Sequence, residues 1–222
     1  RIERATIGTV SLSGAMLYTV VVQSCELNSF ALSDATLDGT YVAFRNNTLN
    51  DDVRLRGVSL INGAALEFAA NNWRDRETVV PTSRVTFETL SLADGSSLLF
   101  LNNSVQTGNQ LPSMAFRNAT LRHGSTHYFD NDTVSCRVLR DHCTDSRSDG
   151  GGVSYDAASA TDGTSAIVMR AMVVVLSPLA GAAAQRFELP ASIAVAAPSD
   201  GDGSPGLREA VKTRASDAVA SA

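Results

Sequence analysis

Short blocks of alternating apolar and polar residues recur along the first part of the chain. Four blocks of eight residues align without gaps, and in each the first, third and eighth residues are apolar while the residues between them are mostly polar. The blocks are residues 30–37, 53–60, 85–92 and 114–121, and residues 10–17 form a fifth copy. A period of two is typical of a β-strand with one buried face. The pattern therefore predicts a tandem series of short strands.

A turn signal and an aromatic residue follow each of the four later blocks at fixed spacing. A glycine comes first, a phenylalanine stands five residues after it, and an asparagine or aspartate stands three residues after the phenylalanine. The glycines are Gly39, Gly63, Gly95 and Gly124, and the phenylalanines are Phe44, Phe68, Phe100 and Phe129. Glycine permits a tight turn, and the phenylalanine marks the next inward-facing position.

The repeat predicts an all-β fold over residues 1–136, namely a right-handed parallel β-helix (a β-solenoid of the pectin-lyase-like kind). The last leucines of the blocks stand at positions 17, 37, 60, 92 and 121, and this unequal spacing fits stacked turns joined by loops of variable length. A leucine-rich-repeat horseshoe also repeats leucine and asparagine. Its leucines lie close around the asparagine and its repeat length is more regular, so the parallel β-helix is the better interpretation.

Residues 137–222 lack the repeat. Residues 137–152 are polar, charged and glycine-rich, and the later stretches 180–184 and 191–198 are rich in alanine. This composition predicts a linker followed by a poorly ordered Ala/Gly-rich tail. Residues 207–222 have helical composition and predict a weak terminal helix.

One polar position of the repeat is occupied by Asn47, Asn71, Asn103 and Asp132. Stacked turns place equivalent side chains about 4.8 Å apart, which is close enough for amides to hydrogen-bond in a ladder. Asparagine also favours turns between strands, and a plain turn needs no ladder. Because the register repeats, we favour a structural ladder with Asp132 at its end.

Four Asn-x-Ser/Thr sequons make Asn46, Asn102, Asn118 and Asn131 candidate N-glycosylation sites. Three of them stand at the same repeat position, just after the recurrent phenylalanine, where a turn would expose them. Sequons also arise by chance in chains rich in Asn, Ser and Thr, and they are modified only in a secreted chain.

The charge and the apolar runs of the chain bear on two kinds of partner, nucleic acids and membranes. The chain of 222 residues has a net charge of −5 and no cluster of basic residues, so we expect no nucleic acid partner. The most apolar run, residues 166–184, is interrupted by Arg170, Pro178 and Gly181, and we expect no membrane-spanning segment there.

Glycan-cleaving enzymes with a parallel β-helix need clustered acidic residues on one face. The available acids are Asp34, Asp38, Asp51, Asp52 and Asp94, and the nearest basic partners in the repeat are Arg54, Arg56 and His123. They occupy different repeat positions, so we predict solvated turn residues and no catalytic residue, since a fold alone does not imply an activity.

Metal and cofactor sites are not predicted either. The candidate zinc ligands are His123, His127, Cys136, His142 and Cys143, but they lack the usual paired spacing. His127 stands where the other copies have Val42, Leu66 and Leu98, which indicates a weakened end of the core. With Cys25 the chain has three cysteines, too few for a disulfide framework, although Cys136 and Cys143 could close a small loop.

Four segments carry a resemblance to a known family: residues 41–48, 51–60, 62–68 and 92–99. They resemble the dispersed gene family one proteins of Trypanosoma cruzi, and the resemblance covers roughly residues 10–134. That family consists of very large repetitive surface proteins with β-helix-like repeats, carboxy-terminal membrane segments and a proposed adhesive role.

The resemblance implies a non-enzymatic repeat module of a membrane-associated cell-surface or secreted protein, with a host-cell or extracellular-matrix ligand. The alternative is a glycan-active β-helix lyase or hydrolase. Family members continue with further repeats, whereas the composition here changes after Cys136, which indicates a fragment or gene remnant.

Overall fold

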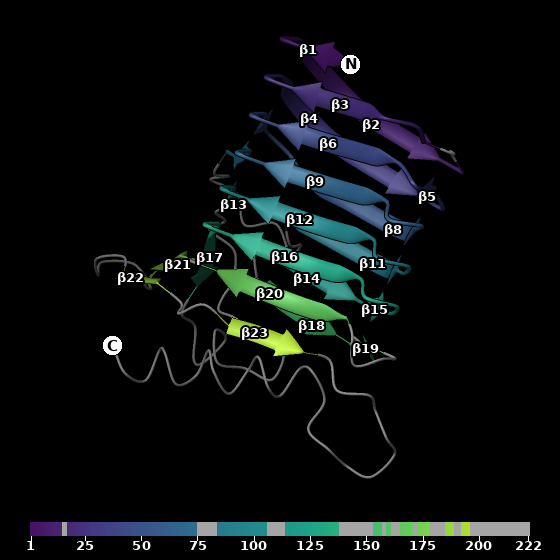
Figure 1. The fold of residues 1–222 in the computed structure, drawn as a ribbon. Helices are drawn as coiled ribbons and strands as arrows, with labels where there is room; N and C mark the ends of the chain where they lie inside the picture. Colours follow the sequence, from purple (N-terminus) through teal and green to yellow (C-terminus); the bar gives the residue numbers. More distant parts are fainter. Residues whose placement is uncertain are drawn as a thin grey trace.

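The computed structural model describes residues 1–14, 17–74, 84–105, 114–137, 153–156, 159–160, 165–170, 173–177, 185–188 and 192–195. These residues form strands, turns and bends, and none of them lies in a helix. The strands belong to two sheets, which we call sheet A and sheet B. Figure 1 shows the strands of sheet A one beside the next, from the amino terminus at one end of the molecule to β23 at the other.

Sheet A contains eight strands in the order of the chain. They are β1 (Ile2–Glu3), β3 (Val20–Gln23), β6 (Tyr41–Arg45), β9 (Ala65–Ala69), β12 (Ser97–Leu101), β16 (Thr126–Asp130), β20 (Ala166–Arg170) and β23 (Ser192–Val195).

Sheet B contains fifteen strands, which are mostly shorter pieces of the chain between successive strands of sheet A. They are β2 (Thr6–Ser13), β4 (Glu26–Ser33), β5 (Thr36–Asp38), β7 (Thr48–Leu49), β8 (Val53–Ile61), β10 (Asn72–Trp73), β11 (Val85–Leu92), β13 (Ser104–Val105), β14 (Met114–Arg117), β15 (Thr120–Leu121), β17 (Thr133–Arg137), β18 (Val153–Asp156), β19 (Ser159–Ala160), β21 (Val173–Ser177) and β22 (Gln185–Glu188).

Successive circuits of the chain lie side by side. From β6 the chain passes through β7 and β8 and returns as β9, which pairs with β6 in parallel from Tyr41↔Ala65 to Arg45↔Ala69. The next circuits return as β12 and β16 in the same way. We call one such circuit a rung. Because neighbouring rungs pair in parallel, equivalent side chains form columns along the stack. Successive side chains within one column are about 4.8 Å apart.

In sheet A, β6, β9, β12 and β16 each end at a corner residue in the left-handed backbone region. The corner residues Asn46, Ala70, Asn102 and Asn131 have φ angles of 52°, 53°, 55° and 54°. Asparagine visits this region more readily than other non-glycine residues. The corner therefore explains why asparagine recurs immediately before the ladder position.

Two columns of phenylalanine fill the core. The rings of Phe44, Phe68, Phe100 and Phe129 stack along sheet A with centroid separations of 5.2, 5.1 and 5.3 Å. From sheet B, Phe87 and Phe116 stack at 4.8 Å and meet the first column edge-on. The phenylalanines that the sequence assigned to inward positions thus share one interior with the block leucines, including Leu60 and Leu92.

From Asn47 to Asp132 the rungs differ in length at one corner. Successive ladder positions are separated by 24 residues from Asn47 to Asn71, by 32 to Asn103 and by 29 to Asp132. The pairing registers show where the extra residues fall: between β10 and β11, and between β13 and β14. In the shortest of these three rungs the same corner is residues 50–52, between β7 and β8.

The end of the repeat requires a correction. A boundary at residue 136 is expected from the sequence, yet β18, β19, β20 and β21 pair in parallel with β14, β15, β16 and β17 and so add one more rung. The sequence hides this rung because Phe129 pairs with Met169 and Leu121 with Ala160, whereas β-branched residues such as Ile167 keep its strand propensity.

After this rung the pairing changes direction. Strand β22 pairs antiparallel with β21, and β23 pairs antiparallel with β20. The helix expected over residues 207–222 lies outside the described residues.

Candidate functional site

The four residues predicted for a ladder form a continuous hydrogen-bonded column. Asn47 Nδ2 donates to Asn71 Oδ1 at 3.0 Å, Asn71 Nδ2 to Asn103 Oδ1 at 3.1 Å, and Asn103 Nδ2 to Asp132 Oδ1 at 2.8 Å. The same oxygens also accept the backbone N–H groups of Asn47, Asn71 and Asn103. All four side chains are about 1 % exposed or less. The polar groups of these side chains therefore form hydrogen bonds within the protein, at the corner where the chain leaves sheet A.

The rung before Asn47 contributes a backbone N–H group to the ladder in place of an asparagine side chain. Asn47 Oδ1 accepts the backbone N–H of Cys25 at 3.0 Å. Cys25 is a buried free cysteine and occupies the ladder position of that rung, 22 residues before Asn47.

A second internal column, made of serines, was not predicted. Ser96 Oγ donates to the carbonyl of Leu60 at 2.9 Å and accepts the N–H of Ala93 at 3.0 Å. In the next rung Ser125 Oγ donates to the carbonyl of Leu92 at 3.1 Å. The recurrent Gly-Ser pairs at 95–96 and 124–125 are the sequence signal that would have found this column.

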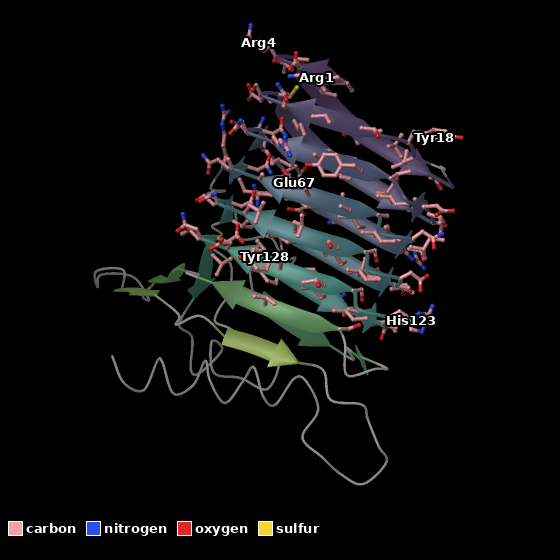
Figure 2. All side chains as sticks on the ribbon, in the orientation of Figure 1. Arg1, Arg4, Tyr18, Glu67, His123 and Tyr128 are labelled. Atoms are coloured by element: carbon pink, nitrogen blue, oxygen red, sulfur yellow. The ribbon has the colours of Figure 1, made fainter. Side chains whose placement is uncertain are left out.

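A cluster of Tyr41, Arg45 and Glu67 lies on the outer face of sheet A. Glu67 stands in the column that contains Ala43 in the preceding rung and Leu99 in the following one. Arg45 Nε donates to Glu67 Oε1 at 2.6 Å, and its Nη2 donates to Oε2 at 3.1 Å. Tyr41 donates its hydroxyl hydrogen to the same carboxylate, and the guanidinium of Arg45 lies 5.6 Å from the Tyr41 ring centroid. Figure 2 shows Glu67 on this face, with Tyr128 farther along it.

The cluster favours a charged Glu67. Burial opposes ionisation, but the hydrogen bonds from Arg45 and Tyr41 and the positive charge of Arg45 outweigh it, so the pKa of Glu67 is lowered. Burial, together with the neighbouring Glu67 carboxylate, raises the pKa of Tyr41. A carboxylate held by three donors is suited to cross-linking two rungs and poorly suited to proton transfer near neutral pH. The sequence signal that would have identified this cluster is an acid at a repeat position that is apolar in the neighbouring rungs.

Among the acids considered for glycan cleavage, Asp51 and Asp52 lie together at the corner where rung length varies. Asp52 is 6 % exposed, and its Oδ2 lies 3.3 Å from Arg54 Nη2. Its Oδ1 lies 3.9 Å from Nη1 of Arg84, which is itself 2 % exposed. Arg84 Nη2 also donates to the carbonyl of Arg74 at 2.8 Å. The sequence did not single out Arg84, because its burial depends on the fold.

The other acids lie at other corners. Asp34 and Asp38 are exposed, and Asp38 Oδ1 accepts a hydrogen bond from Asn62 Nδ2 at 2.7 Å. Asp94 Oδ1 lies 2.9 Å from Nδ1 of the exposed His123. The structure therefore places Asp52, with Asp51 beside it, against arginines. It does not bring Asp34, Asp38 and Asp94 to that corner.

The residues considered as zinc ligands lie apart in the part of the chain that the structure describes. His123 is exposed at a turn, whereas His127 is fully buried against Phe116 and Phe129, with ring centroids 4.5 and 4.4 Å away. Burial lowers the pKa of His127 to about 3, so its ring is neutral. No group of three His, Cys, Asp or Glu side chains within the described residues could hold a metal ion. His142, Cys143 and the side chain of Cys136 lie outside that part.

The four sequon asparagines are all exposed and all adopt positive φ. Asn131 Nδ2 donates to Asn102 Oδ1 at 2.6 Å, so these two lie on adjacent rungs of one corner. Asn118 lies at a different corner, in sheet B between β14 and β15.

Comparison with known proteins adds no relative. The part of the chain that the structure describes contains no helix that is long and apolar enough to cross a membrane. The chain matches no protein-family model and no curated protein.

Proposed function

We propose that this chain is a non-enzymatic repeat module of a large cell-surface protein that acts in adhesion or surface display. We further propose that its two sheets wind as a right-handed parallel β-helix of the pectin-lyase-like kind. The parallel register between successive rungs and the side-chain columns at two corners support this winding.

The observation that carries the proposal is a constant interior combined with variation at one corner. From Asn47 to Asp132 the ladder and the phenylalanine column keep their register although the rungs are 24, 32 and 29 residues long. A protein that presents connections of different length needs a constant interior, because binding residues are commonly carried on connections held by a rigid framework.

The resemblance to dispersed gene family one supports the cellular setting. It favours a membrane-associated surface or secreted protein, a host-cell or extracellular-matrix ligand, and modification at Asn46, Asn102, Asn118 and Asn131. The exposure of these four side chains is compatible with attached glycans.

The alternative is a glycan-active enzyme, and it is favoured by the corner at which Asp51, Asp52, Arg54 and Arg84 gather. An acid pair beside arginines is a starting point for glycan cleavage. The ion pairs of Asp52 with Arg54 and Arg84 favour a structural role for that carboxylate instead.

Two experiments separate the proposals. The purified chain is incubated with pectic and host glycans, and reducing ends and unsaturated products are measured. We expect none, and turnover that disappears in the Asp51→Asn, Asp52→Asn double variant would establish the enzyme instead. In parallel, labelled chain is applied to mammalian cells and to immobilised matrix proteins. Saturable binding is expected, and its absence from both would refute adhesion.

The scaffold itself is tested by shortening one connection. Residues 106–113 are replaced by Asn-Asp-Asp, the sequence that occupies the same corner at residues 50–52. The β-rich circular dichroism spectrum and the unfolding midpoint should be retained, and loss of the folded state would contradict a spine that is independent of this corner.

A further inference from the structure

Each ladder asparagine donates one side-chain hydrogen to a backbone carbonyl oxygen of sheet A on the preceding rung. Asn47 Nδ2 donates to the carbonyl of Val22 at 3.0 Å, Asn71 Nδ2 to that of Phe44 at 2.9 Å, and Asn103 Nδ2 to that of Phe68 at 2.9 Å. Val22, Phe44 and Phe68 pair with one another in register. The bond is therefore a repeated feature of the rung.

Asp132 occupies the next ladder position but has an oxygen where the asparagines have Nδ2. Its Oδ1 accepts the backbone N–H of Asn103 and one Nδ2 hydrogen of Asn103, at 2.8 Å each. Its Oδ2 is buried and has no hydrogen-bond partner among the described residues. The carbonyl that continues the series belongs to Phe100, which pairs with Phe68. A carboxylate has no hydrogen to donate to a carbonyl, whereas a protonated carboxyl group carries one O–H donor.

We propose that Asp132 binds a proton in the folded protein and donates it from Oδ2 to the carbonyl oxygen of Phe100, in place of the amide hydrogen of the ladder asparagines. The ladder thereby ends in a proton-binding site. This site is independent of the proposed surface function.

The surroundings of Asp132 favour the neutral form. Burial raises the pKa of Asp132 to about 7, although hydrogen bonds from Asn103 and from the backbone of Asp130 oppose this, and the charge of Asp130 raises the pKa further. The ladder neighbour on the preceding rung is the neutral Asn103. On the following rung Val173 pairs with Thr133, the residue after Asp132.

Two further titratable residues belong to these rungs. His127 lies in the core of the same rung and is neutral, because burial lowers its pKa to about 3. Arg170 pairs through its backbone with Asp130. Asp130 rather than Asp132 is therefore the acid in register with a basic residue.

The free energy of unfolding of the stacked rungs should therefore decrease as the pH rises. The ordinary pKa of the carboxyl group is 3.8 and the folded value is about 7, so the folded chain holds a proton that the unfolded chain releases. The stabilisation from this proton is fully present below about pH 4 and is lost as the pH rises towards about 7. Each unit of pKa difference changes the unfolding equilibrium constant about tenfold, so the full effect is at most roughly a thousandfold.

The experiment compares Asp132→Asn with the wild-type chain in urea unfolding between pH 5 and pH 8.5. The variant restores the amide hydrogen, and its unfolding equilibrium constant at pH 8.5 should be at least about tenfold lower than that of the wild type, with a smaller difference at pH 5. Asp130→Asn is the matched control and should keep most of the pH dependence, because the charge of Asp130 is the smallest of the effects that shift the pKa of Asp132. An equal pH dependence in Asp132→Asn and the wild type would overturn the proposal.

A spectroscopic readout on the wild-type chain does not depend on how the variant folds. At pH 6 the infrared spectrum should contain the carbonyl band of a buried protonated carboxyl group, and the band should fade as the pH rises above 7. A spectrum at pH 6 with only ionised carboxylate bands refutes the proton-binding site.

Discussion

Replacing Asn71 with alanine tests the ladder at its centre. The Oδ1 of Asn71 accepts the backbone N–H and the Nδ2 of Asn47, and its Nδ2 donates to the carbonyl of Phe44 and to Asn103 Oδ1. Alanine leaves two donors of Asn47 without this acceptor, at a site that is 1 % exposed. Each buried polar group that loses its partner costs about 1–3 kcal/mol, so we expect a loss of about 2–6 kcal/mol in the free energy of unfolding.

The measurement is urea unfolding followed by circular dichroism, with Asn72→Ala as the matched control. Asn72 is the next residue in the chain and its side chain is exposed, so this variant should change the free energy of unfolding by less than about 0.5 kcal/mol. Because stacked rungs can unfold in parts, amide hydrogen exchange at Asn47 gives a local readout. Equal stability of the two variants, with unchanged protection of the Asn47 amide, would refute the ladder as a source of stability.

Three further predictions concern the core, the outer face and the carboxy-terminal rung. Phe100→Ala should cost about 3–5 kcal/mol in urea unfolding, because Phe100 is fully buried between Phe68 and Phe129, whereas Tyr18→Ala at a 78 % exposed site should cost little. Glu67→Gln should cost about 1 kcal/mol at pH 7 and nothing once the pH falls well below 4.5, since the lowered pKa gives stability that acid removes; an unchanged acid unfolding curve would contradict this. Truncation after residue 137 should cause concentration-dependent association in sedimentation, because it uncovers the edges of β14, β16 and β17, while a truncated chain that stays monomeric would count against strand pairing there.

The sequence predicted the class of fold because its periodicity is local. Alternation within each block identified the strands, and equal spacing from glycine to phenylalanine to asparagine predicted that successive rungs pair in parallel. The all-β class and the parallel sheets are confirmed. The rung after residue 137 was missed because Met169 and Ala160 replace the phenylalanine and leucine by which the repeat is recognised.

The candidate sites were harder to predict because their contacts depend on register. Glu67, Tyr41 and Arg45 come together only when β6 and β9 pair, and the sequence contains no motif that joins them. Arg84 is separated from Asp52 by a connection of one particular rung, so repeat alignment could not pair them. In contrast, the ladder asparagines share one repeat position, and alignment alone placed them in a column.

The position of the ladder explains why rung length can vary without loss of register. The ladder fixes the corner at which the chain leaves sheet A, and the serine column, with Ser96 and Ser125, fixes the turn by which the chain returns to it. Between them, the chain passes from β10 to β11 and from β13 to β14, and at this corner the rungs gain residues. At this corner Asp52, just before β8, and Arg84, just before β11, form an ion pair that joins two neighbouring rungs. From Asn47 to Asp132, polar columns therefore mark the two corners that keep a constant length, and the rung length changes at the corner between them.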